Sequence, residues 1–85
     1  MEYVYVLQSV KDRKFYTGST GDLRKRFYEH QAGKSMATKS RRPFVLIYYE
    51  ACMNRADAQK REMYLKTAWG KRYIKNRLRR YLTGQ

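Results

Sequence analysis

The chain has 85 residues, of which 42% are hydrophobic, and 20 Lys and Arg against seven Asp and Glu give it a formal net charge of +13. This length admits one domain with a thin core, because so short a chain buries only about 60% of its unfolded surface. No apolar run could span a membrane, no signal peptide begins the chain, and one cysteine makes neither an internal disulfide nor a zinc site. We therefore expect a reduced, cytoplasmic setting and no membrane contact.

The first half of the chain predicts a β-hairpin followed by a helix. Residues 3–8 alternate two sets of apolar side chains, and residues 14–18 follow a polar turn, which is typical of paired antiparallel strands. Small and polar residues then break the second strand and offer N-caps for a helix over residues 22–31. Helical spacing places four residues on one face of this helix: Leu23, Arg26, Phe27 and His30.

The second half predicts one more strand and two helices. A basic loop leads to residues 44–50, a β-branched and aromatic run expected to form the third and central strand. Asn54 is expected to cap a second helix, which Gly70 interrupts. Its inner face is predicted to hold Ala58, Glu62, Leu65 and Trp69. A third helix over residues 71–82 is predicted to bury Ile74, Leu78, Tyr81 and Leu82.

The predicted fold class is therefore α+β, with a small, mostly antiparallel three-stranded sheet flanked by helices in the order β-β-α-β-α-α. Residues 1–82 are expected to form the single domain, and residues 83–85 a short C-terminal tail.

The large excess of positive charge indicates a polyanionic partner, since self-repulsion destabilises a small folded domain. Nucleic acid is the leading candidate, and the alternative is a highly soluble basic protein. Two segments, residues 34–42 and 71–80, carry the cations that we expect to track phosphates: Lys34, Lys39, Arg41, Arg42, Lys71, Arg72, Lys75 and Arg77.

Glu62 is the least expected residue of the chain, because it interrupts an otherwise apolar helix face. An ionised carboxylate in that position must be paired or must bind a metal. Magnesium commonly takes only one or two protein carboxylates and completes its shell with water and phosphate. The alternative is an ion pair, either with Lys66 one turn later or with Arg26.

Arg26 and His30 lie one helical turn apart, and Tyr5 and Tyr16 are predicted on neighbouring strands of the hairpin. A guanidinium can hold phosphate oxygens in a bidentate contact, and an imidazole near neutral pH can accept a proton. Each residue also has a plain structural interpretation: a solvated basic face, a core histidine and ordinary strand tyrosines.

The ordered set of motifs resembles the GIY-YIG nuclease superfamily, over nearly the whole chain. Residues 3–5 (Tyr-Val-Tyr) stand for the first motif and residues 16–18 (Tyr-Thr-Gly) for the second. The match continues through Arg26, His30 and Glu62 to Asn76. The chain is most similar to small stand-alone bacterial members, which resemble the catalytic domains of excision-repair, homing and structure-specific endonucleases.

The resemblance implies hydrolysis of phosphodiester bonds with one divalent ion, Mg²⁺ or Mn²⁺. It implies that Glu62 holds the metal, and that Arg26 neutralises charge on the phosphate. Tyr5 activates or orients the attacking water with help from His30, and Tyr16 positions water or phosphate. Gly18 and Asn76 have supporting roles, Gly18 by allowing a tight turn. Tyr3 and Thr17 depart from the usual glycine and isoleucine of the motifs, and neither change removes one of these groups.

We therefore expect a metal-dependent DNA endonuclease, acting on branched or damaged DNA and related to repair. The alternative is a non-catalytic basic module that binds DNA or RNA through its cations and tyrosines. Because 85 residues leave no room for a separate recognition domain, low sequence specificity and recruitment by a protein partner are expected.

Overall fold

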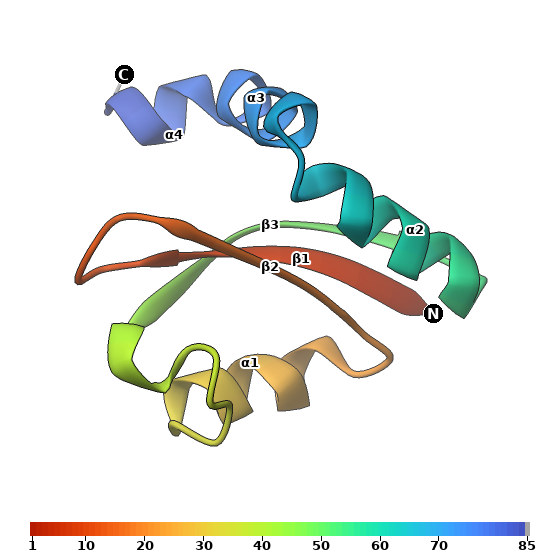
Figure 1. The fold of residues 1–85 in the computed structure, drawn as a ribbon, viewed down its shortest axis with the longest axis horizontal. Helices are drawn as coiled ribbons and strands as arrows, with labels where there is room; N and C mark the ends of the chain where they lie inside the picture. Colours follow the sequence, from red (N-terminus) through yellow and green to blue (C-terminus); the bar gives the residue numbers. More distant parts are fainter. Residues whose placement is uncertain (85) are drawn as a thin grey trace.

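The structure, a computed structural model, describes residues 1–84. Its middle layer is an antiparallel sheet of β1 (Glu2–Ser9), β2 (Phe15–Thr20) and β3 (Phe44–Cys52). One helix, α1 (Leu23–Gln31), covers one face of the sheet, and a turn of 3-10 helix, η1 (Lys39–Arg41), follows it. The other face is covered by α2 (Arg55–Leu65), α3 (Ala68–Arg77) and α4 (Arg79–Thr83) (Figure 1). The predicted α+β class and element order are confirmed, with the last helical segment divided in two.

The strand order is β2-β1-β3, so the prediction that residues 44–50 form the central strand is wrong. The central strand is β1, which is buried on both faces because helices cover both sides of the sheet. Val4 and Val6 pack toward α2 and α3, whereas Tyr5 and Leu7 pack toward α1. The strand β3 lies at an edge, where Tyr49 is 54% exposed.

The second helix ends earlier than its apolar pattern predicted. The helix α2 stops at Leu65, and Thr67 begins a new helix by accepting a hydrogen bond from the Gly70 amide at 3.2 Å. The prediction that Trp69 lies on the buried face of the second helix is therefore wrong: it belongs to α3 and is 67% exposed. Gly70 does not interrupt a helix either. It is buried inside α3, where a Cβ would collide with the backbone of Tyr64 and Leu65.

The third predicted helix is also divided, at Leu78, whose backbone leaves the helical conformation. Ile74 is buried, and Leu78 and Leu82 are half-buried, but Tyr81 is exposed, so its predicted place in the buried stripe is wrong. Thr83 of the predicted tail belongs to α4, and Gln85 lies outside the described residues. Within residues 1–84, no helix is long and apolar enough to cross a membrane.

Candidate active site at the edge strand β2

The centre of the candidate site is a buried chain of hydrogen bonds between the sheet and α1. Tyr5 on β1 and His30 on α1 meet with the phenol oxygen 2.8 Å from Nε2. The other ring nitrogen, Nδ1, lies 2.7 Å from the hydroxyl of Thr38, in the loop after α1. All three side chains are buried, with 1% of Tyr5 exposed and none of His30 or Thr38. His30 therefore sits inside the core and not at its rim.

The direction of this chain follows from the Thr38 hydroxyl. The Thr38 hydroxyl lies 3.5 Å from the carbonyl of Ser35, and we assign its proton to that carbonyl, so that the hydroxyl accepts from Nδ1–H of His30. Nε2 then carries the lone pair, and the Tyr5 hydroxyl donates to it. Burial lowers the pKa of His30 below its usual 6.5, and the nearby Arg26 charge lowers it further. A neutral imidazole that accepts from Tyr5 is the result.

Gly18 makes room for the Tyr5 ring on the neighbouring strand. It pairs directly with Tyr5 across the sheet, and a Cβ at this position would lie 2.5 Å from the phenol oxygen. Gly18 is thus needed for close approach within β2, and not for a tight turn as predicted. Tyr16, also on β2, stacks edge-on against the His30 ring with centroids 5.1 Å apart. The two motif tyrosines therefore meet at one imidazole.

Arg26 lies one turn before His30 on α1, at the surface above Tyr5. Its Nη1 donates to Glu29 at 3.1 Å, and its side chain is 33% exposed. Burial raises the pKa of Tyr5 to about 12, although the Arg26 charge acts to lower it. Burial disfavours the charged form of Arg26, but the contacts with Tyr5 and Glu29 outweigh this effect and raise its pKa. The phenol therefore remains protonated and the guanidinium charged at neutral pH.

Glu62 approaches β2 from the opposite face of the sheet, on α2. Its Oε1 accepts from the hydroxyl of Ser19 at 2.6 Å, and its Oε2 lies 2.7 Å from Nζ of Lys66. The ion pair with Lys66 was one of the two interpretations that the sequence left open. The Lys66 side chain is 52% exposed, so the pair is readily exchanged with solvent.

The group of Tyr5, His30 and Arg26 and the pair of Ser19 and Glu62 approach each other where β2 leads into α1. A depression of about 490 Å³ opens there, and its walls include Ser19, Thr20 and Arg26. The hydroxyl that holds Glu62 and the guanidinium above Tyr5 therefore border one opening, although α1 and α2 cover opposite faces.

The Ser19 hydroxyl at this opening, together with the Glu62 carboxylate behind it, fits a hard cation with few protein ligands. Glu62 offers one carboxylate and Ser19 a hydroxyl, and Mg²⁺ accepts such a sparse oxygen set when water and phosphate complete its shell. Within the described part of the chain there is no cluster of three or more His, Cys, Asp or Glu residues. A closed site of the zinc type is therefore not formed by these residues.

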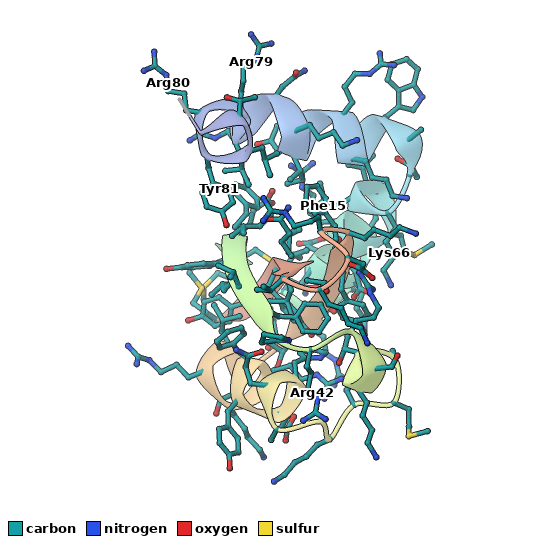
Figure 2. The ribbon with its side chains drawn as sticks, turned by 90° about the vertical axis from the view of Figure 1, so that its left-hand side faces the viewer. Phe15, Arg42, Lys66, Arg79, Arg80 and Tyr81 are labelled. Carbon is teal, nitrogen blue, oxygen red and sulfur yellow. The ribbon has the colours of Figure 1, made fainter. Side chains whose placement is uncertain are left out.

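The eight predicted phosphate-binding cations do not form one surface. Lys34, Lys39 and Arg42 lie in the loop beside α1, whereas Lys71, Arg72, Lys75 and Arg77 lie on α3, on the opposite face of the sheet (Figures 1 and 2). Arg41 joins the second group, because it borders a groove together with Lys71 and Lys75. Arg41 is also held by Asp12 at 2.9 Å.

Sequence reasoning missed Thr38 and Ser19. Nothing marks Thr38 within a basic loop, but strand alternation places Ser19 on the face opposite Gly18, toward Glu62. Asn76, a predicted supporting residue, is exposed on α3 and borders a depression between α3 and α4. The structure thus brings together Tyr5, Tyr16, Gly18, Arg26 and His30, with Glu62 across the strand, and places Asn76 at a separate surface feature.

Known proteins share both the sequence pattern and the fold. The profile of the GIY-YIG catalytic domain matches residues 1–75. The chain belongs to the GIY-YIG family. UPF0213 proteins of Staphylococcus haemolyticus and Clostridium perfringens are 42% and 43% identical to it, over 76% and 78% of this chain and 79% and 71% of theirs. A solution NMR structure of a UPF0213 protein from Bacillus halodurans superposes with a TM-score of 0.53 at 33% identity, covering 87% of this chain and 82% of that one.

Membership of the GIY-YIG family makes this chain a nuclease-type domain, and it confirms the resemblance found in the motifs. GIY-YIG nucleases act on DNA and generally use divalent metals, in keeping with the single carboxylate and the positive charge of this chain. The name of the UPF0213 relatives specifies no substrate or cofactor.

Proposed function

We propose that the chain is a divalent-metal-dependent endonuclease that hydrolyses DNA phosphodiester bonds at the end of β2. The observation that carries this proposal is that one depression is bordered both by Arg26, which contacts Tyr5 of the buried Tyr5–His30 pair, and by Ser19, which holds the Glu62 carboxylate. In-line attack on a phosphodiester needs charge neutralisation and an oriented water more than covalent chemistry.

In the proposed reaction, the water oriented by Tyr5 attacks the phosphorus, and the bond from phosphorus to the leaving oxygen breaks. The water gives a proton to the Tyr5 oxygen while the phenol proton passes to Nε2 of His30, and the leaving oxygen takes a proton from solvent. Because Tyr5 is almost fully buried, Arg26 must move aside for water to reach the phenol. Arg26 forms a surface ion pair with Glu29, and such a pair adds little to stability. A phosphate can therefore draw the guanidinium away from Glu29. Arg26 then neutralises the charge that develops on the phosphate, and Tyr16 holds the phosphate or water against the His30 ring.

Glu62, with Ser19 beside it, is the residue that would hold the single Mg²⁺ or Mn²⁺ ion. When bound, such an ion supplies a positive charge that stabilises the leaving oxygen. The protein would contribute by releasing Glu62 from its ion pair with Lys66, while Ser19 would keep the carboxylate oriented. In the free protein, both Arg26 and Glu62 are therefore held in weak ion pairs that substrate and metal replace.

The test is cleavage of supercoiled plasmid, linear duplex, flap and junction DNA with Mg²⁺, Mn²⁺ or EDTA. Glu62→Ala and Tyr5→Phe should each reduce cleavage about a hundredfold or more, by the cost of losing one group that stabilises a charged transition state. Asp57→Asn is the matched control, because it removes an exposed carboxylate from the same helix. Cleavage by Glu62→Ala at the wild-type rate would reject the proposal. Preference for flaps or junctions would support a role in the repair of branched DNA.

The second candidate function is binding of DNA or RNA without catalysis. It is favoured by one observation: both carboxylate oxygens of Glu62 already have partners within the chain, which explains this residue without a metal. This function predicts tight, salt-sensitive binding, no cleavage with any metal, and no effect of Glu62→Ala on affinity.

A further inference from the structure

A second concave surface lies at the other end of β2, beneath the C-terminal helices. This groove, of about 630 Å³, is lined by residues of the β1–β2 turn, α3 and α4. Figure 1 shows the β1–β2 turn beneath these helices. Phe15 and Leu82 give it an apolar floor. Seen from this end of the molecule, Phe15 points from the sheet toward the helical layer (Figure 2). The groove is separate from the depression that contains Arg26 and Ser19.

Cations from four segments border this groove. Arg13 and Lys14 come from the β1–β2 turn, Lys71 and Lys75 from α3, Arg79 from α4 and Arg41 from η1. Lys71 and Lys75 are one helical turn apart, where like charges repel. Arg41 is paired with Asp12, but no ion pair joins any of the other five to a carboxylate among residues 1–84. A groove with this charge is matched by an anionic ligand.

The combination of an aromatic floor with cationic walls fits unpaired nucleotides better than duplex DNA. Proteins that bind single strands combine a basic channel with aromatic rings on which exposed bases stack. A paired duplex offers phosphates to the cations but no free base face to Phe15.

The groove and the Ser19–Glu62 part of the candidate site lie on the same face of the sheet, whereas Tyr5 and Tyr16 face α1. Phe15 packs with the cluster beneath α2 and α3, and Ser19 contacts Glu62 of α2, so both face the same side of β2. Phe15 and Ser19 are four positions apart along the strand, about 13 Å at the usual rise. This distance corresponds to about four nucleotides of a stacked strand.

We propose that this groove binds an unpaired strand of the substrate, so that the domain selects DNA with a single-stranded segment about four nucleotides from the cut. The proposal rests on the proposed nuclease function for the position of the cut, and on the groove alone for the binding of the strand.

Binding is tested first, in EDTA, by fluorescence anisotropy with a labelled oligo(dT) and with a duplex of equal length. Lys71→Ala/Lys75→Ala should lower the slope of log affinity against log salt for oligo(dT) by about 1.4, since each phosphate contact on a single strand contributes about 0.7. Phe15→Leu, which keeps an apolar side chain, should weaken oligo(dT) binding about tenfold and leave duplex binding nearly unchanged. Lys25→Ala/Lys60→Ala removes the same charge from exposed positions outside the groove and is the control.

The strand-binding proposal is overturned if Lys71→Ala/Lys75→Ala and the control weaken oligo(dT) equally, or if Phe15→Leu weakens duplex and oligo(dT) alike. Cleavage assays distinguish a failure of the strand-binding proposal from a failure of the nuclease proposal. On a flap substrate, the cut should lie about four nucleotides from the unpaired segment, and the groove variant should lower the ratio of flap to duplex cleavage. If nothing is cleaved while the anisotropy results hold, the nuclease proposal fails and the strand-binding groove stands. A wild-type cut with no relation to the unpaired segment would overturn the selection of such substrates.

Discussion

At the scale of single residues, the site depends on how His30 is held. The imidazole is the only one in the chain, it is fully buried, and both of its nitrogens have partners. A buried histidine with two partners is an ordinary core residue by itself. Its place beneath Tyr5, beside the Arg26 charge, makes its tautomer relevant to function.

Thr38→Val should uncouple this imidazole from its partner without changing the volume of the side chain much. The Nδ1–H of His30 would be buried without an acceptor, which costs about 1–3 kcal/mol of unfolding free energy. The alternative tautomer would relieve that cost but would place a proton on Nε2, where Tyr5 needs a lone pair. We therefore expect a loss of cleavage rate of at least tenfold, with rescue by Thr38→Ser. Urea unfolding and the rate of plasmid nicking measure the two effects, and full activity in Thr38→Val would show that Thr38 does not set the tautomer.

The lowered pKa of His30 also predicts how stability depends on pH. Because the folded state holds the imidazole neutral, the unfolded chain binds the extra proton near pH 6.5 and the folded chain does not. Stability is therefore complete above pH 6.5 and falls as the pH decreases below it, by up to about 2 kcal/mol at pH 5. Urea unfolding at pH 7.5 and pH 5 measures this change, and His30→Gln should reduce it. An unfolding free energy that is equal at both pH values would contradict the neutral assignment.

At the scale of secondary-structure elements, sequence patterns predicted which segments form strands and helices, but not where neighbours alter them. The alternation in residues 3–8 is correct, and both sets of side chains are buried. The pattern alone, however, did not identify this strand as the central one. Burial on both faces indicates a central strand only when helices are known to cover both sides of the sheet. The break after Leu65 has a local cause, the Thr67 cap, which the helical spacing of residues 58, 62, 65 and 69 obscured.

Gly70 gives the clearest prediction about how two elements pack. In the interior of an exposed helix, glycine to alanine stabilises by about 1 kcal/mol. Here the added methyl would collide with the backbone of Tyr64 and Leu65, so α3 would have to separate from α2. We expect Gly70→Ala to destabilise the fold by about 2 kcal/mol or more, measured by thermal or urea unfolding. Gly21→Ala is the control, because its nearest contact is a flexible carboxylate at 3.4 Å. Stabilisation by Gly70→Ala would mean that the two helices are not in contact there.

The ion pair along α2 predicts how the metal requirement responds to mutation. Lys66 and Glu62 are one turn apart, and such exposed pairs contribute at most about 1 kcal/mol. Lys66→Met should free the carboxylate and lower the Mg²⁺ concentration needed for half-maximal cleavage by up to about fivefold. Calorimetry should show a matching increase in the affinity for Mn²⁺. Lys60→Met, an exposed change on the same helix, is the control. Weaker metal binding in Lys66→Met would show that Lys66 supports the ion site and does not compete with it.

At the scale of the whole molecule, the sequence predicted a nucleic-acid partner but not the arrangement of the cations. The domain is a slab of 33 × 29 × 19 Å, and its long dimension matches about ten base pairs of duplex. Charge counts do not reveal that the basic loop and α3 lie on opposite faces, because that depends on strand order. The same strand order brings Tyr5, Gly18 and Glu62 to one end of β2, although they are far apart in the chain.

This division of charge sets the salt dependence of DNA binding. With cations on opposite faces, one duplex cannot contact all of them, and we expect about five phosphate contacts despite a net charge of +13. Each contact contributes about 0.9 to the slope of log affinity against log salt, so the slope should be about −4.5. Affinity should then fall several hundredfold between 50 and 200 mM salt. Anisotropy titrations of a labelled duplex in EDTA measure the slope. A value near −10 would mean that the DNA wraps both faces, and a value above −2 would mean that the charge serves mainly as a solvated surface.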